Sequence, residues 1–196
     1  SRLVDVGDFT ARASRITYVG ELGWELVVPA EFAVGVYDVL KAAGADLGVR
    51  DAGYYAINAL RLEKGYRAFG PELNPDYGPV EAGLLFAAKS ASGFIGRDAL
   101  QAAQQAPPRR RLVSWTAGDP SAMLWGGELM LRDGAGAGQV TSAAYATTTG
   151  ACVGLGYVRG EVDLEGTWAI SVGGRMVPVT VSLSAPYDPT NARIRS

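Results

Sequence analysis

The second half of the sequence places the strongest constraint on the fold. After Pro107 and Pro108, short apolar segments rich in β-branched residues follow one another at even spacing, separated by turn dipeptides such as Asp-Gly at 133–134. Such dipeptides favour tight hairpins, and a series of short strands predicts a small antiparallel barrel or sandwich. The predicted strands cover residues 111–116, 128–132, 138–145, 151–158, 168–172 and 175–183.

The first half mixes strand and helix patterns. Alternating segments before residue 29 predict an antiparallel sheet. Apolar residues at three- and four-residue spacing predict helices over 31–43 and 51–64, with Asp51 as the N-cap of the second helix and Gly65 as its stop. The fold class is therefore α+β, and the proline break predicts domains over 1–106 and 107–196. Two shorter elements are a buried strand over 84–87 and a helix over 97–105.

Several kinds of chemistry are excluded by composition. The 196 residues contain no histidine and one cysteine, Cys152, which lies in an apolar run. The chain therefore has no Ser-His-Asp triad, Cys-His pair or internal disulfide, and we expect no metal site. A net charge of −2 with interspersed signs argues against nucleic acid as a partner.

The membrane and export signals are also missing from the sequence. The apolar runs are much shorter than the about 20 residues that a membrane span needs, so we expect no membrane partner. The first residues carry charge where a signal peptide would be apolar. We expect a cytoplasmic location.

Residues 18–25 hold the densest group of candidate binding residues, YVGELGWE. The two glycines permit a tight turn, and around them lie a tyrosine, an indole and two carboxylates. Glu25 falls in an apolar strand, where a buried carboxylate needs hydrogen-bond donors. A flat heterocycle with adjacent N–H and NH₂ groups would supply them, as guanine-like and pterin rings do. The alternative is a solvent-facing Glu25 paired with a basic neighbour such as Arg15, and the residues alone leave both open.

Three other motifs allow a functional and a structural interpretation. The segment LRLEKGYR at 60–67 either aims an Arg or Tyr into a pocket or ends a helix with surface charges. Glu81 either caps the backbone or acts as an acid near a site. The basic triplet RRR at 109–111 either binds phosphate or is a solvated strand start.

Taken together and in order, these motifs resemble the aminomethyltransferase family, the T-protein of the glycine cleavage system and its relatives. The resemblance rests on YVGELGWE at 18–25, LRLEKGYR at 60–67, PVEAGL at 79–84, FIGR at 94–97, GQVTS at 138–142 and VGLGYV at 153–158. It covers nearly the whole chain and implies an α+β fold, an antiparallel sheet with flanking helices followed by a C-terminal antiparallel β-barrel.

The resemblance also implies a cofactor and a site. The family binds tetrahydrofolate and handles a one-carbon unit as methylene-tetrahydrofolate. By resemblance, Glu25 is the carboxylate that holds the pterin edge, Tyr18 lies beside it, and Phe69 is a further candidate near the folate. The family's catalytic aspartate lies in an N-terminal segment that this sequence does not contain, so the resemblance implies no catalytic residue within these residues.

Two departures from the T-protein pattern point to a branch of the family. Ile57 stands where the T-protein has a folate-holding arginine, and Ala192 stands where it has a tyrosine. The sequences of the motifs resemble the folate-binding halves of dimethylglycine and sarcosine dehydrogenases or oxidases more than they resemble the T-protein itself. In those proteins FAD belongs to a separate domain, and no Gly-x-Gly-x-x-Gly fingerprint for such a domain is present here. We expect folate and a missing N-terminal segment or flavin domain as partners. The alternative is a non-catalytic folate-binding or structural module.

Overall fold

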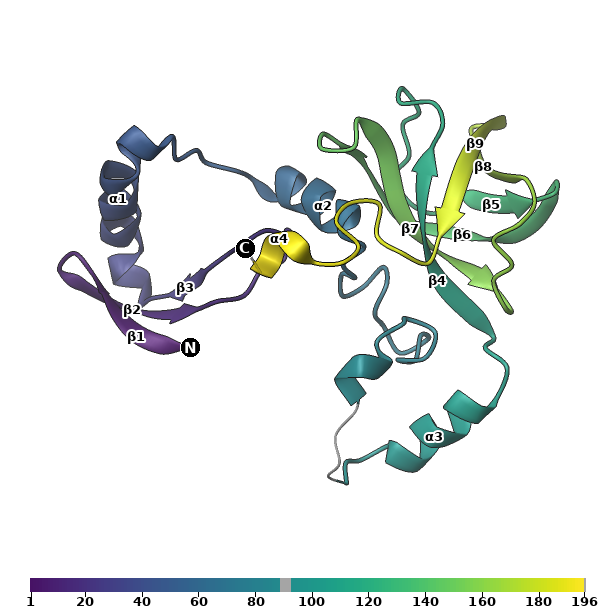
Figure 1. The fold of residues 1–196 in the computed structure, drawn as a ribbon, viewed down its shortest axis with the longest axis horizontal. Coiled ribbons are helices and arrows are strands. Elements are labelled where there is room, and N and C mark those ends of the chain that lie inside the picture. Colours follow the sequence, from purple (N-terminus) through teal and green to yellow (C-terminus); the bar gives the residue numbers. More distant parts are fainter. Residues whose placement is uncertain (89–92, 196) are drawn as a thin grey trace. The chain divides into compact units, whose positions relative to one another are not determined.

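The computed structural model describes residues 1–88 and 93–195 and confirms the α+β fold class (Figure 1). Its internal contacts group into two compact units. The first unit comprises Ser1–Ile57 and Thr190–Ser196, and the second comprises Asn58–Pro189. Helix α2 (Tyr54–Glu63) contributes residues to both units. The predicted domain boundary after residue 106 stays a prediction.

The first unit is built on a three-stranded antiparallel sheet. Strands β1 (Arg2–Val6), β2 (Phe9–Ser14) and β3 (Glu25–Val27) pair in the order β1-β2-β3. A short turn of 3₁₀-helix, η1 (Ala30–Phe32), leads into α1 (Ala33–Ala43), and η2 (Ala45–Leu47) follows it. The short helix α4 (Ala192–Arg195) also belongs to this unit.

Helix α1 packs closely on the β1–β2 hairpin. A Cβ at Gly35 would lie 2.2 Å from the Phe9 ring, so only glycine permits this approach. Gly7 in the hairpin turn lies against Val39 and has a φ of +60°. Because Phe9, Ala11 and Ala13 alternate along β2, they share the face that the helix covers. Ala11, Ala13 and Val36 are accordingly buried.

The second unit is dominated by a closed antiparallel barrel, as the family resemblance implies. Its strand order is β4-β7-β6-β5-β8-β9. Large apolar side chains fill the interior, among them Trp115, Met130 and Ile170. The strands are β4 (Arg110–Ala117), β5 (Leu129–Arg132), β6 (Ala135–Ala146), β7 (Ala151–Arg159), β8 (Trp168–Val172) and β9 (Arg175–Ser182).

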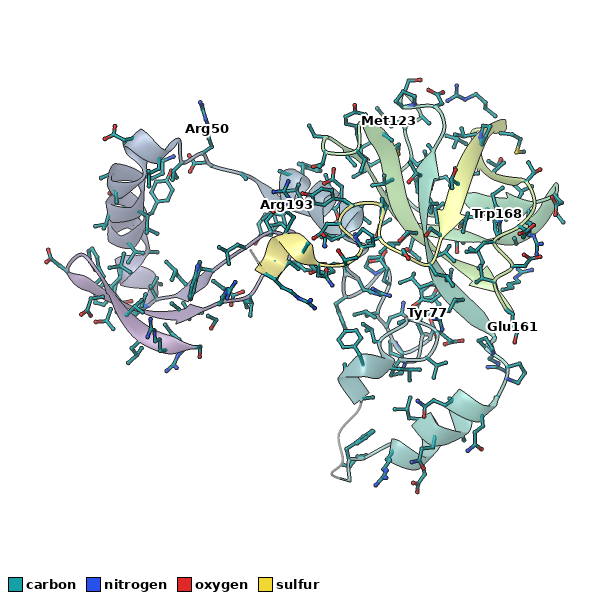
Figure 2. All side chains as sticks on the ribbon, viewed as in Figure 1. Arg50, Tyr77, Met123, Glu161, Trp168 and Arg193 are labelled. Carbon is teal, nitrogen blue, oxygen red and sulfur yellow. The ribbon has the colours of Figure 1, made fainter. Side chains whose placement is uncertain are left out.

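The segment that precedes the barrel covers part of the outer face of β4 and β7. Leu62 and Tyr77 from this segment form a second apolar cluster with Leu112, Leu155 and Tyr157. The Tyr77 and Tyr157 rings stack with their centroids 3.9 Å apart, and Figure 2 labels Tyr77 beside the barrel. The outer face of these strands is therefore a packing surface and not a solvent face.

Two local predictions are wrong. Residues 84–87 were expected to form a buried strand, but they lie mostly in the 3₁₀-helix η3 (Leu85–Ala88), which contains no buried residue. Asp51 does not cap α2, which begins three residues later. Its carboxylate instead accepts hydrogen bonds from Tyr37 and Lys41. The predicted helix over 97–105 is confirmed as α3 (Arg97–Gln105).

Gly154 provides a test of barrel packing. A Cβ at this position would lie 2.2 Å from the Ser142 carbonyl oxygen and 2.3 Å from the Trp115 ring. We expect Gly154→Ala to reduce the free energy of unfolding by roughly 1–3 kcal/mol, because neither neighbour can move freely. Urea unfolding followed by tryptophan fluorescence measures this loss.

Gly118→Ala is the matched control for the barrel. Its added Cβ would meet only the Pro178 carbonyl oxygen, at 3.6 Å, which is ordinary contact. Its unfolding free energy should stay within about 0.5 kcal/mol of the wild type. Equal stability of the two variants would contradict the packing described at Gly154.

Candidate functional site

Glu25 lies on the open face of the three-stranded sheet. It is the first residue of β3 and pairs with Ser14 of β2. Successive side chains in a strand point to opposite faces, so Glu25 shares its face with Val27 and with Arg12 opposite Val27. Helix α1 covers the other face. Among residues 1–88 and 93–195, no side chain forms a hydrogen bond or ion pair with the Glu25 carboxylate.

The sequence left open whether Glu25 is buried or faces solvent, and its exposed position answers this question. In the described part of the chain its side chain faces solvent, as the solvent-facing interpretation required. The pairing with Arg15 is absent from the described part of the chain, where the Arg15 guanidinium donates to the Ile194 carbonyl oxygen at 3.3 Å. Glu25 therefore presents both carboxylate oxygens as acceptors. Its role toward a ligand stays a prediction.

The loop that carries Tyr18 is held by Thr17. The Thr17 Oγ1 accepts hydrogen bonds from the backbone N–H groups of Val19, at 3.2 Å, and Gly20, at 3.1 Å. Gly20 has a φ of +80°, and a Cβ at Gly23 would lie 2.9 Å from the Ile16 carbonyl oxygen. The glycines predicted to allow a tight turn are therefore required by this geometry.

Apolar side chains surround this loop and remain exposed. A hollow of about 420 Å³ lies beside it, lined in part by Ile16, Leu22 and Arg195, and neither Glu25 nor Tyr18 lines it. Exposed apolar side chains that lie together on a surface often mark a binding site. The exposed apolar and aromatic residues here are Ile16, Tyr18, Leu22, Trp24 and Val27.

Phe69 belongs to the second unit, whereas Glu25 and Tyr18 belong to the first. It lies at a turn in which Gly70 has a φ of +102°, and its side chain is 88% exposed. An exposed phenylalanine on a turn is available for contact with a ligand. Its role stays a prediction.

A buried carboxylate in the second unit was missed by the sequence analysis. Glu72 is fully buried, and its Oε2 accepts from Arg61 Nη1 and from the Ala68 N–H, each at 2.9 Å. Its Oε1 accepts from the hydroxyls of Thr141 and Ser142, each at 2.6 Å. Four donors thus satisfy the charge, which a buried carboxylate requires.

A bulge in β6 allows two neighbouring residues to reach the same carboxylate. The pairing of β6 with β7 shifts register between Val140 and Ser142. A bulge interrupts the alternation of side chains, so consecutive residues can point toward the same face. Thr141 and Ser142 accordingly both donate to Glu72, and the Tyr157 hydroxyl donates to the Glu72 carbonyl oxygen at 2.9 Å.

The neighbouring charges of the 60–67 motif are also buried. Lys64 donates to the Asp188 carboxylate at 3.0 Å and to its carbonyl oxygen at 2.6 Å. Glu63 accepts from the Thr148 backbone N–H at 2.8 Å. Burial lowers the pKa of Arg67, whose guanidinium donates to two backbone carbonyl oxygens. The interpretation as surface charges is therefore wrong, because Arg61, Glu63 and Lys64 are buried. The interpretation of the motif as aiming a side chain into a pocket stays a prediction.

The structure also bears on the interpretations of Glu81 and Cys152. Glu81 caps the backbone by accepting from the Gly78 N–H at 2.9 Å, as its structural interpretation expected. Cys152 is buried in the barrel, and this burial raises the pKa of its thiol, so it is a core residue. Within the part of the chain that the structure describes, no group of acidic or cysteine side chains could hold a metal ion. In the same residues, no helix has the length and apolarity needed to cross a bilayer.

Comparisons with known proteins assign both parts of this chain. The family model described as the GCVT N-terminal domain matches residues 1–92. The model described as the glycine cleavage T-protein C-terminal barrel domain matches residues 110–188. The chain belongs to the glycine cleavage T-protein family. The resemblance stated from the sequence motifs is thereby confirmed.

Curated relatives of this T-protein family member include large oxidoreductases. A 4-methylaminobutanoate oxidase (formaldehyde-forming) from Paenarthrobacter nicotinovorans is 38% identical over 99% of this chain and 24% of its own length. Mitochondrial sarcosine dehydrogenase from Mus musculus is also 38% identical, over 99% of this chain and 22% of its own length. The chain thus spans about a quarter of the length of these relatives.

Aminomethyltransferases are similar as well. The aminomethyltransferase of Halothermothrix orenii is 37% identical over 74% of this chain and 41% of its own length. The crystal structure of glycine cleavage system aminomethyltransferase T from Bartonella henselae matches with a TM-score of 0.79 and 25% identity. That match covers 90% of this chain and 49% of the other. The chain is therefore an aminomethyltransferase-like part related to dimethylglycine and sarcosine dehydrogenases.

The Glu72 network provides the test of how this family member is held together. Glu72→Gln removes the charge that balances Arg61 and leaves a buried guanidinium without its counter-ion. We expect the free energy of unfolding to fall by about 3 kcal/mol or more, as for other broken buried ion pairs. Urea unfolding of the two proteins measures the difference.

Arg175→Gln is the control for charge removal at the surface. Arg175 pairs with Asp119 at 3.3 Å, and both side chains are exposed. Its loss should cost below about 1 kcal/mol. If the two substitutions cost the same, the Glu72 network does not stabilise the second unit in the way described.

Proposed function

We propose that this chain is the tetrahydrofolate-binding portion of an aminomethyltransferase-like one-carbon transfer protein of the demethylating flavoenzyme branch. The observation that carries the proposal is the joint match of both T-protein domains, together with an unpaired Glu25 on an open, partly apolar sheet face. Support for the branch comes from the names of the relatives, which describe enzymes of 4-methylaminobutanoate, sarcosine and dimethylglycine.

The residues around Glu25 fit a pterin ring in their chemistry. Its carboxylate offers two acceptors, and the pterin edge offers adjacent N–H and NH₂ donors that one carboxylate can receive together. Aromatic and aliphatic side chains nearby, Tyr18 and Val27 among them, supply apolar surface for a ring. Phe69 is the third residue that we propose to contact folate.

When bound, tetrahydrofolate would be the acceptor of the one-carbon unit. In this proposal the chain contributes binding and orientation: Glu25 fixes the pterin edge, and the apolar side chains reduce the access of water. We assign no catalytic role to any residue of this chain. The proton-transferring acid and an FAD domain are proposed to lie in other parts of a longer, cytoplasmic protein.

Glu25→Gln tests the assigned carboxylate. The amide keeps one acceptor but places an NH₂ group against a donor, so one charge-assisted hydrogen bond is lost and the other is weakened. Bonds to charged groups contribute roughly 1.5–3 kcal/mol each, so we expect tetrahydrofolate to bind at least about tenfold more weakly. Isothermal titration calorimetry on the longer protein that contains this chain measures the affinity.

Glu31→Gln is the matched control, because it removes the same charge from an exposed site at η1 in the first unit. This variant should bind folate as the wild type does. Equal affinities of the wild type and Glu25→Gln would remove Glu25 from the site.

A second test concerns turnover. Because the 196 residues contain no histidine and the single cysteine is buried, we expect them alone to produce methylene-tetrahydrofolate from tetrahydrofolate and formaldehyde at the uncatalysed rate. The longer protein should catalyse this reaction. A rate for the 196 residues that exceeds background and disappears in Glu25→Ala would show that the catalytic groups lie within this chain.

A further inference from the structure

A basic cavity lies on the outer face of the barrel, within the second unit. Its volume is about 540 Å³, in the range of small-molecule sites. Arg109, Arg110 and Arg159 line it, together with Tyr77 and Tyr157. Among the described residues that line the cavity, none is an aspartate or glutamate. The cavity therefore carries a concentrated positive charge.

The strand register brings two of these arginines together. Arg110 of β4 and Arg159 of β7 are direct cross-strand partners, so their side chains leave the same face of the sheet. Like charges directly opposite each other destabilise a strand pair. The next pair on the same face of these strands is Leu112 with Tyr157, which is already covered by the preceding segment. The arginine pair lies just beyond that cover.

The guanidinium groups of this cavity have unused donors. In residues 1–88 and 93–195, the side chains of Arg109, Arg110 and Arg159 donate no hydrogen bond. Arg110 has one acidic neighbour, Glu81, at 3.8 Å, and that carboxylate already accepts from the Gly78 N–H. Within the described residues, Arg110 is thus the one arginine of the three that has an ion-pair partner.

Aromatic stacking holds one of the guanidiniums in place. The Arg110 guanidinium lies over the Tyr77 ring, 5.1 Å from its centroid, and the Tyr77 ring stacks with the Tyr157 ring. Burial raises the pKa of Tyr157, whose hydroxyl is fixed to the Glu72 carbonyl oxygen. A stacked guanidinium keeps its N–H edge available in a fixed direction, which suits a planar or tetrahedral oxyanion.

We propose that Arg109, Arg110 and Arg159 form a binding site for a small molecule that carries two or more negative charges on phosphate or carboxylate oxygens. Such an anion offsets the repulsion between Arg110 and Arg159 and uses their free donors. The site consists of second-unit residues alone and does not depend on the folate proposal. It extends the binding interpretation of the basic triplet to anions in general for Arg109 and Arg110, whereas Arg111 donates to the Val80 carbonyl oxygen.

The test measures binding of defined anions to the full chain by calorimetry in a buffer of low ionic strength. Inorganic pyrophosphate and citrate are the probes, and acetate is the singly charged control. Pyrophosphate or citrate should bind saturably and raise the melting temperature, whereas acetate should do neither at the same concentration. A preference for pyrophosphate would identify a phosphate site, and a preference for citrate a carboxylate site; both support the proposal.

Substitutions separate the cavity from general surface charge. Arg159→Gln and Arg109→Gln should each weaken binding about tenfold, whereas Arg175→Gln, which removes the same charge from β9, should leave it unchanged. Without anion, Arg159→Gln should melt no lower than the wild type, because a repulsive pair has been removed. The absence of saturable binding by both probes, or an equal loss in Arg175→Gln, would overturn the proposal.

Discussion

The second unit depends on the satisfaction of one buried carboxylate. Glu72 accepts hydrogen bonds from Arg61, the Ala68 N–H, Thr141 and Ser142, and its side chain is fully excluded from solvent. A carboxylate buried without these donors would carry a desolvation cost of several kcal/mol. The network therefore couples the end of α2, the turn at Glu72 and the bulge of β6, because each supplies a donor that the others cannot replace.

This coupling determines which part of the barrel's outer face is covered. Once Glu72 is fixed, Leu62 and Tyr77 pack on Leu112, Leu155 and Tyr157. The cover ends at the stacked pair Tyr77–Tyr157. Beyond it lie the cross-strand arginines Arg110 and Arg159, which line the basic cavity beside the covered surface of the barrel.

The sequence predicted the barrel well because its signals are local. Turn dipeptides and β-branched runs located all six strands to within a few residues, and α3 matched its predicted bounds. Residues 84–87 were misassigned because an apolar run that short does not distinguish a strand from a helical turn. One of the two interpretations of the 60–67 motif placed its charges at the surface, since charged residues are seldom buried unless paired.

The partners of those charges could not be found from one sequence. Thr141 and Ser142 lie about 70 residues from Glu72, and Asp188 lies 124 residues from Lys64. No periodicity connects positions so far apart. In the candidate site, by contrast, the motif itself identified Glu25 as a possible binding carboxylate. Only the sheet register shows that Glu25 lies on an open face beside Val27 and Arg12.

That open face is where the functional account is decided. Helix α1 covers one side of the sheet, and the other side presents an unpaired carboxylate among exposed apolar side chains, the chemistry that a pterin edge requires. The most direct test is a crystal structure of the longer protein with tetrahydrofolate bound. The account predicts both Glu25 carboxylate oxygens within hydrogen-bond distance of the pterin N–H and NH₂ groups. A bound pterin that makes no contact with Glu25 would contradict it.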